Sequence, residues 1–215
     1  HVELEVDGQP RSYEVYAPPS YDGETPLPLV LNFHGITGDG AGQAASTEMN
    51  DAADERNLIV VYPNGYENSW NGGLCCGEAF EDAIDDVAYT RALVQSVSAL
   101  GCVDTRRVYA TGFSNGAILT HTLACRASDL FAAVAPVSGP RLVEPGACDD
   151  ARPMPILMLQ GVDDRLSSYE LAEQSLDEWR EDYACDGEPL LDESLPSALC
   201  ESYEGCSDDA SISFC

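Results

Sequence analysis

The sequence predicts an α/β fold in which helices cover both faces of a mostly parallel sheet. Apolar runs of strand length alternate along the chain with segments whose apolar residues recur at helical spacing. The chain opens with two segments of alternating polarity around a Gly-Gln-Pro turn, which is typical of a β-hairpin. A length of 215 residues suffices for one sizeable core and is short for two, so we expect a single domain over residues 1–215.

In the first half of the chain we expect a hairpin, two buried strands and one helix. Residues 1–16 form the hairpin, which we place antiparallel at one edge of the sheet. Residues 27–35 are a continuous apolar run that ends in glycine, which predicts a strand buried on both faces. A helix is expected over residues 41–57, followed by a second buried strand over 58–65. The glycine-rich residues 66–80 lack periodicity and are expected to form a loop.

The second half repeats the alternation of helix and strand. Residues 81–101 have apolar positions at helical spacing and end at a glycine, which predicts a helix. The remaining expected elements are a strand over 107–114, a helix over 115–125, strands over 131–139 and 154–161, a serine-capped helix over 167–185 and a short final strand over 211–215.

The charge balance excludes two classes of partner. The chain has 38 acidic residues against 10 basic ones, all of them arginine, and a formal net charge of −28. Such a surface repels nucleic acid and anionic membranes, so neither is expected as a partner. The composition fits a secreted protein, and it leaves open whether the acidity is an adaptation to a saline habitat. We expect the protein to be a monomer.

The nine cysteines predict disulfides in an oxidising compartment. Cys-x-x-Cys spacing is lacking and histidine is scarce, so we expect no metal site. Because nine is odd, one thiol is free or its partner lies outside the chain. Connectivity does not follow from the spacing; the pairs we favour are Cys125–Cys148 and Cys200–Cys206.

A Gly-x-Ser-x-Gly motif at Gly112–Gly116 marks a candidate nucleophile, Ser114. The motif alone is weak and also occurs in plain turns. Here it lies between a predicted strand and a predicted helix, where Gly112 and Gly116 remove the β-carbons that would collide in a sharp turn. Ser114 would then project from the carboxyl end of a buried strand, at the start of a helix.

Two further groups fit the same chemistry. We expect the backbone N–H of Asn115 and that of Ile36 or Thr37, in the stretch FHGITGDG, to form an oxyanion hole. Asp163 and Asp164 follow the predicted strand that ends near residue 160. The alternatives are that both face water or that one of them orients an imidazole, and by position we favour Asp164 over Asp163 for that role. His34 is a possible base, although a histidine there more often holds the loop by hydrogen bonds.

These residues lie in sequence stretches that resemble those of a known protein family. The stretches occur in the same order as in the family and extend over almost the whole chain. The stretches are RSYEVYAPPSY, PLPLVLNFHG, SWNGGLCCG, DDVAYTRALV, VDTRRVYATGFSNGA, LACRASDLFAAVAPVSG and PMPILMLQGVDD. The chain resembles the secreted esterases that include polyhydroxybutyrate depolymerases, feruloyl esterases and related acetylxylan esterases, which share the α/β-hydrolase fold.

The resemblance implies roles for individual residues. Ser114 is expected to be the nucleophile, and Asp164 the triad acid, although Gln160–Asp164 lacks the His and Thr of the family's His-Gly-Thr-x-Asp stretch. Trp70 matches a tryptophan near the substrate cleft, with core packing as the alternative, and Thr37 is a second expected substrate contact. Asp86 is expected to brace the loop beneath the site. Neither a metal nor an organic cofactor is implied.

The base of the triad is missing from these assignments. His1 lies on a terminal strand, and His121 follows Ser114 by seven residues, about 10.5 Å along one helix. In the family, the stretch corresponding to GCSDDASISFC precedes a Gly-His-x-Trp-Pro segment with the catalytic histidine. We therefore expect the chain to stop before that loop, with the C-terminal end of the fold incomplete.

The resulting prediction is a secreted serine ester hydrolase that acts on feruloyl or acetyl esters of plant polysaccharide or on a hydroxyalkanoate polyester; the sequence does not decide among these substrates. The alternative is a non-catalytic protein that binds polysaccharide or polyester and has lost its base. Without an imidazole, Ser114 would be a weak nucleophile at neutral pH.

Overall fold

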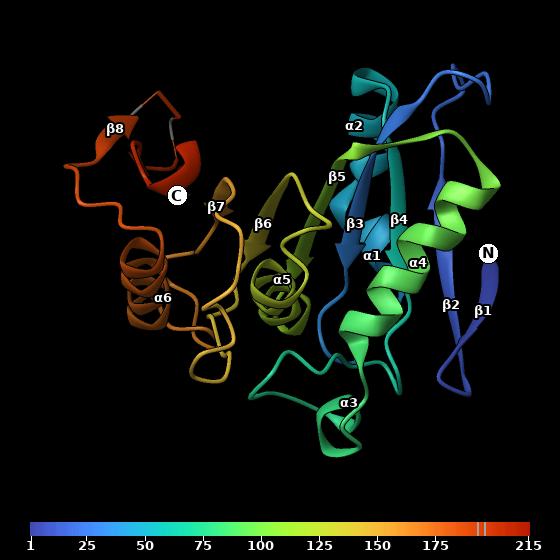
Figure 1. The fold of residues 1–215 in the computed structure, drawn as a ribbon, viewed down its shortest axis with the longest axis horizontal. Coiled ribbons are helices and arrows are strands. Elements are labelled where there is room, and N and C mark those ends of the chain that lie inside the picture. Colours follow the sequence, from blue (N-terminus) through green and yellow to red (C-terminus); the bar gives the residue numbers. More distant parts are fainter. Residues whose placement is uncertain (193, 196) are drawn as a thin grey trace.

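The computed structural model describes residues 1–192, 194–195 and 197–215. In this part of the chain, ten strands form one sheet in the order β1-β2-β4-β3-β5-β6-β7-β10-β9-β8 (Figure 1). The strands are β1 (Val2–Val6), β2 (Gln9–Tyr16), β3 (Leu27–Phe33), β4 (Ile59–Pro63), β5 (Val103–Phe113), β6 (Ala133–Val137), β7 (Ile156–Met158), β8 (Leu190–Asp192), β9 (Cys200–Tyr203) and β10 (Ile212–Phe214).

The centre of the sheet is parallel, as predicted. β4, β3, β5, β6, β7 and β10 all run in the same direction. The hairpin β1–β2 lies at one edge and pairs antiparallel with β4, which confirms its predicted place. Since the six central strands are parallel, their carboxyl ends meet at one edge of the sheet, where ligand sites of open α/β sheets form.

Helices cover both faces. They are α1 (Gly40–Thr47), α2 (Met49–Arg56), α3 (Glu78–Glu81), α4 (Asp86–Leu100), α5 (Asn115–Arg126) and α6 (Tyr169–Asp182), with a 3₁₀ turn, η1, at Ser207–Asp209. Figure 1 shows α4, α5 and α6 in front of the sheet, with α1 and α2 behind. From β3 the chain moves along the sheet to β4, and from β4 it returns in the opposite direction to β5. With right-handed crossovers, these opposite directions place the connecting helices on opposite faces of the sheet.

The segment predicted as one helix over 41–57 is two helices. Glu48 adopts a left-handed conformation with φ 51° and separates α1 from α2. The Thr47 hydroxyl donates back to the Gln43 carbonyl at 2.9 Å and accepts from the Asn32 amide at 3.2 Å. Hydroxyl bonds of this kind compete with continued helix bonding, and composition alone does not reveal them.

The C-terminal strands were only partly predicted. β10 lies near its predicted place, whereas β8 and β9 follow it in the sheet without having been expected. All three residues of β8 are exposed, so this strand has no alternation of apolar and polar residues for a sequence pattern to reveal.

The pairing of β9 with β10 also determines the disulfides. In the antiparallel register Phe214 lies opposite Glu201, which brings Cys215 to Cys200. The predicted pair Cys200–Cys206 is therefore wrong. Cys206 instead joins Cys185, with Cα atoms 4.4 Å apart.

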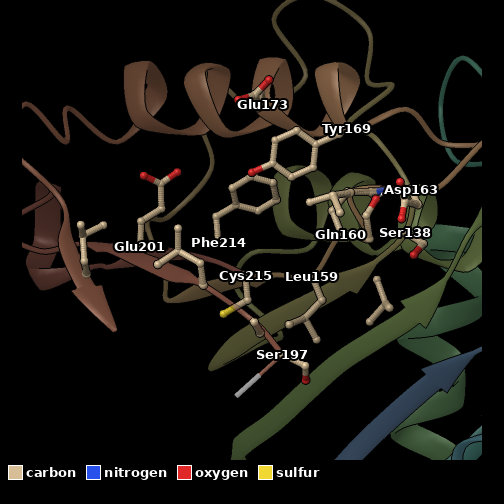
Figure 2. A pocket seen from close by; sticks show the side chains of 16 residues that line it. Ser138, Leu159, Gln160, Asp163, Tyr169, Glu173, Ser197, Glu201, Phe214 and Cys215 are labelled. Atoms are coloured by element: carbon tan, nitrogen blue, oxygen red, sulfur yellow. Dashed lines mark hydrogen bonds between the residues drawn. The ribbon is translucent and has the colours of Figure 1, made fainter. Parts of the chain in front are cut away.

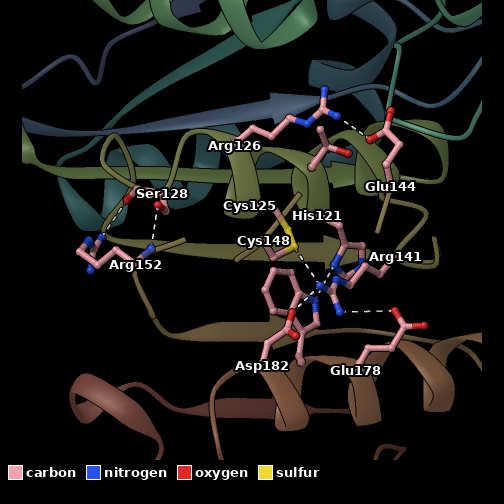
Figure 3. Close-up of a disulfide and its surroundings, with 12 residues drawn as sticks. His121, Cys125, Arg126, Ser128, Arg141, Glu144, Cys148, Arg152, Glu178 and Asp182 are labelled. Atoms are coloured by element: carbon pink, nitrogen blue, oxygen red, sulfur yellow. Dashed lines mark hydrogen bonds and ion pairs between the residues drawn. A yellow bond between two sulfur atoms is a disulfide. The ribbon is translucent and has the colours of Figure 1, made fainter. Parts of the chain in front are cut away.

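The predicted pair Cys125–Cys148 is present at the end of α5 (Figure 3). Beside it, the Arg141 guanidinium bridges Glu178 and Asp182 of α6 and lies over the Trp179 ring, 4.3 Å from its centroid. This cluster ties α6 to the loop after β6, on the same side of the sheet as α5.

The main core lies between the sheet and the front helices, where most of the fully buried apolar side chains gather. Among the described residues, no helix combines the length and the apolar character that crossing a bilayer requires.

Candidate active site

Ser114 occupies a strained turn between β5 and α5. Its φ of 55° and ψ of −117° are unusual for a residue with a side chain, and its backbone N–H donates to the Val137 carbonyl at 3.0 Å. A β-carbon on Gly112 would lie 2.4 Å from the Gly116 carbonyl oxygen, and one on Gly116 would lie 2.4 Å from that of Phe33. The steric reason predicted for both glycines is thereby confirmed.

The loop after β3 lies directly against this turn. A β-carbon on Gly35 would lie 3.4 Å from the Ser114 β-carbon, so the next residue, Ile36, begins beside Ser114. The backbone N–H of Thr37 donates to the Asn68 carbonyl at 2.8 Å. Within the described residues the Ile36 N–H has no hydrogen-bond acceptor, and this difference favours Ile36 over Thr37 as an oxyanion donor. Thr37 is exposed, at the surface of the loop after β3.

Asn115 provides the second candidate donor from the first turn of α5. The first N–H groups of a helix have no intrahelical acceptor, so its backbone N–H is available to a ligand. Its buried carboxamide accepts from the Trp70 N–H at 2.7 Å and donates to the Trp70 carbonyl at 2.9 Å. Both the oxygen and the nitrogen of the Asn115 side-chain amide are thereby held by the backbone of Trp70.

Trp70 is fully buried, so its indole contacts the core rather than solvent. The ring lies edge-on to Phe33 and stacks on Tyr89. Its Nε1–H donates to the His34 carbonyl at 2.9 Å. These contacts correspond to the core-packing alternative, and they place the indole beneath the loop that carries Ile36.

Asp86 braces the loop that contains Asn71, as predicted. Asp86 is buried and accepts from the Arg11 guanidinium at 2.7 Å and from the Asn71 N–H at 2.8 Å. The Arg11 guanidinium also lies over the Tyr89 ring, 3.8 Å from its centroid. This buried ion pair anchors the loop between β4 and α3 next to Trp70.

Asp164 follows β7 at the same edge of the sheet as Ser114. Its carboxylate accepts from the backbone N–H groups of Ser167 at 3.0 Å and Leu166 at 2.9 Å. These hydrogen bonds lower the pKa of Asp164, and the Gln160 and Ser138 side chains act in the same direction. Ser138 in turn follows Val137, which binds the Ser114 N–H, whereas Asp163 is exposed. The contacts favour Asp164 as the residue that orients a base.

All three histidines have other partners. The ring of His34 donates from Nδ1 to the Gly35 carbonyl at 2.7 Å and accepts at Nε2 from the Gly65 N–H at 3.0 Å. Burial lowers its pKa. His34 therefore holds the loop, as such a residue was expected to do.

His121 and His1 are equally unsuited as the base. His121 is fully buried, accepts from the Trp179 indole at 2.9 Å and lies 3.2 Å from the Gly139 carbonyl; burial lowers its pKa to about 3. His1 pairs with Glu14 at the exposed N-terminal hairpin.

A cavity of about 770 Å³ lies between α6 and the ends of β6, β7 and β10, and its lining includes Asp163 rather than Asp164 (Figure 2). Its apolar lining includes Leu159, Tyr169 and Phe214, and Glu173 and Glu201 lie at its margin. Cys215, whose carbonyl accepts from the Gln160 N–H at 2.9 Å, also lines it. The cavity thus combines an apolar surface with the edge of the sheet that carries Asp164.

Two features of the site were missed from the sequence. Ser138, with φ 50°, lies between the candidate nucleophile and the candidate acid, and its residue type alone did not distinguish it. Cys75 and Cys76 form a disulfide with each other. The adjacent cysteines in a glycine-rich loop were the available signal for this bond.

Comparisons with known proteins identify the family of the chain. The family described as "Esterase PHB depolymerase" matches residues 11–163. Feruloyl esterase B of Piromyces equi is 30% identical over 95% of this chain and 41% of that protein. A bifunctional acetylxylan esterase/xylanase of Neocallimastix patriciarum is 30% identical over 83% of this chain and 25% of that protein. The chain therefore spans less than half the length of these relatives.

The fold also matches solved structures. The acetyl xylan esterase from Aspergillus awamori superposes with a TM-score of 0.74 at 16% identity, covering 94% of this chain and 86% of that one. At this identity the likeness shows the fold alone, which is that of the α/β hydrolases. The match over residues 11–163 shows that the chain belongs to the PHB depolymerase family of esterases.

Proposed function

We propose that the protein is a secreted serine ester hydrolase that cleaves carboxylic esters through an acyl-enzyme on Ser114. The observation that carries this proposal is the contact between the strained turn at Ser114 and the loop that begins at Gly35. A plain turn has no need of this strain, whereas a nucleophile must be exposed beside donors for a developing negative charge.

In the proposed reaction the Ser114 hydroxyl attacks the ester carbonyl carbon and loses its proton to a base. The carbonyl oxygen becomes an oxyanion, which the backbone N–H groups of Ile36 and Asn115 stabilise. The tetrahedral intermediate expels the alcohol, which takes up the proton from the base. Water then attacks the acyl-enzyme in the same way and releases the acid.

Asp164 is proposed to orient and stabilise the imidazole of that base. Because its pKa is lowered, it remains a carboxylate at neutral pH and accepts a hydrogen bond from the ring. Since the three histidines of the chain hold other partners, we place the base outside residues 1–215. A segment that followed Cys215 would emerge beside Gln160 and the cavity, at the edge that carries the acid.

Candidate substrates are esters of ferulic or acetic acid on plant polysaccharide and esters of a hydroxyalkanoate polyester. The names of the relatives support the first two, and the family description supports the third. We assign Trp70 a supporting role beneath the oxyanion loop, since its indole is buried. The exposed Thr37 side chain is the proposed contact for substrate at the rim. Four disulfides support function in an oxidising, extracellular environment.

The proposal is tested in the full-length protein with p-nitrophenyl acetate, methyl ferulate, acetylated xylan and hydroxybutyrate oligomers. We expect Ser114→Ala to lower kcat by 10⁴-fold or more, as loss of a triad member does on the order of 10⁴ to 10⁶. Ser98→Ala, on α4, is the matched control and should retain wild-type kcat. The ranking of kcat/KM among the four substrates identifies the ester.

The assignment of the triad acid is tested by comparing substitutions of the adjacent residues Asp164 and Asp163, for which we expect different effects on kcat. Asp164→Asn should lower kcat by at least about 10²-fold, because the base loses its orienting charge. Asp163→Asn should leave kcat within about twofold. The reverse pattern would assign the acid to Asp163. A full-length protein that binds polysaccharide or polyester but hydrolyses no ester would instead be a non-catalytic binder.

A further inference from the structure

The disulfide between Cys75 and Cys76 lies at the candidate active site rather than in the scaffold. It belongs to the loop between β4 and α3, which crosses the start of α5. The Cys76 sulfur lies 3.4 Å from Nδ2 of Asn115, the residue after the proposed nucleophile. Neither cysteine is fully buried.

The sulfur completes the hydrogen bonding of the Asn115 side chain. The carboxamide has two N–H donors. One donates to the Trp70 carbonyl at 2.9 Å, and Cys76 Sγ is the acceptor nearest the other. Asn115 is almost fully buried, so a donor without a partner there would be costly, and the side chain would reorient to find one.

The same turn borders the other arm of the oxyanion hole. Gly77, with φ 77°, directly follows the disulfide. A β-carbon on it would lie 2.6 Å from the Ser69 β-carbon and 3.2 Å from Cδ1 of Ile36. Cys76 therefore contacts the side chain of Asn115, and the next residue, Gly77, lies against the side chain of Ile36.

A disulfide between adjacent residues restrains only its own turn. Bonds that join distant segments stabilise the whole fold by shortening the loops of the unfolded chain, and this effect grows with loop length. The Cys75–Cys76 bond closes almost no loop, so its effect should be local. Its contacts reach the side chains of Asn115 and, through Gly77, Ile36, the two residues whose backbone N–H groups are the proposed oxyanion donors.

We propose that the Cys75–Cys76 disulfide is a positioning element of the oxyanion hole, which keeps the backbone N–H groups of Asn115 and Ile36 oriented toward the reacting carbonyl. The inference rests on the proposed function and adds a residue pair that touches no substrate atom. Because the oxyanion exists only in the transition state and intermediate, loss of the disulfide should lower kcat and leave KM nearly unchanged.

The test compares two double variants of the full-length protein. Cys75→Ser/Cys76→Ser leaves a hydroxyl that can accept from the Asn115 side chain, so the thermal midpoint should be nearly unchanged. Loss of the restraint that the disulfide imposes should lower kcat for p-nitrophenyl acetate about tenfold, with KM within twofold. Affinity for a boronic acid, which mimics the tetrahedral intermediate, should fall by a similar factor. Cys125→Ser/Cys148→Ser removes a bond that lies eleven residues after Ser114, about 16 Å along α5. This control should lower the thermal midpoint and keep kcat within twofold.

A second experiment applies if the serine variant does not fold. Dithiothreitol reduces a disulfide to two thiols, and the reagent supplies two electrons and two protons as it becomes a cyclic disulfide. Alkylation and peptide mapping during partial reduction then report which pair has opened at each loss of activity. We expect the loss of kcat to follow the opening of Cys75–Cys76.

The inference is overturned if opening this pair leaves kcat unchanged, or if both double variants lose kcat in proportion to their thermal midpoints. Failure of the proposed function gives a different result. In that case a fluorophosphonate does not label Ser114 even in the wild-type protein, whatever the state of the disulfide.

Discussion

The buried ion pair beneath the site allows the most quantitative prediction. Asp86→Ala removes a carboxylate that is fully buried and that accepts both from Arg11 at 2.7 Å and from Asn71 at 2.8 Å. The substitution leaves a buried guanidinium without its counter-ion, which typically costs about 3–5 kcal/mol. The Asn71 N–H also loses its acceptor, which contributes about 1–3 kcal/mol where water does not replace it.

These two costs overlap, since relaxation at one group relieves the other. We therefore expect Asp86→Ala to lower the free energy of unfolding by about 4 kcal/mol. Asp86→Asn preserves an acceptor for Asn71 and should cost less. The double variant Arg11→Met/Asp86→Leu removes both charges, so its free energy of unfolding should lie within about 1–2 kcal/mol of the wild type.

Urea unfolding at pH 7, followed by fluorescence and extrapolated linearly to water, measures these differences. Esterase activity of the folded variants gives an independent readout, because Asn71 adjoins the tryptophan that holds Asn115. A cost below about 1 kcal/mol for Asp86→Ala, or a double variant less stable than either single one, would refute the reasoning that the charges stabilise each other.

Three further predictions concern other parts of the structure. Removal of the Cys125–Cys148 bond should lower the free energy of unfolding by roughly 3 kcal/mol, measured by urea titration, because its cysteines are separated by 23 positions; an unchanged midpoint would contradict this. Burial lowers the pKa of His121 from the ordinary histidine value of 6.5 to about 3, so below pH 6.5 the unfolded chain binds a proton that the folded chain does not. Stability should then fall by up to about 1.4 kcal/mol per pH unit between pH 6.5 and 3, and His121→Gln should lack this contribution when the two proteins are unfolded side by side. Gly116→Ala places a β-carbon 2.4 Å from the Phe33 carbonyl oxygen, so kcat should fall by at least about 10²-fold as the oxyanion loop shifts; wild-type kcat would show that the loop is not part of the site.

The central sheet was predictable because burial dictates its residue pattern. β3 and β4 are continuous apolar runs, and Gly112 and Gly116 were recognised by what a side chain would strike. The break at Glu48 was not predictable, because it depends on hydrogen bonds to a neighbouring strand. β8 was missed because it is fully exposed and has no apolar alternation.

The positions of the candidate site residues were predictable where a sequence motif marks the end of a strand or the start of a helix. Ser114, Asn115 and Asp164 do lie at the strand and helix ends where the sequence placed them, and their chemical roles stay predictions. The burial of Trp70 and the contact between Cys76 and Asn115 depend on how distant segments pack, so the sequence left them open. The partner of Cys200 likewise required the register of β9 against β10.

The claim on which the account depends is that Ser114 is the residue that becomes acylated. A fluorophosphonate reacts with serines that a base and an oxyanion hole activate, and mass spectrometry of the digested full-length protein locates the adduct. We predict one phosphonate on the peptide that contains Ser114, with hydrolysis lost in proportion to labelling. A protein that hydrolyses esters while this peptide stays unmodified, or that carries the label on another residue, would contradict the account.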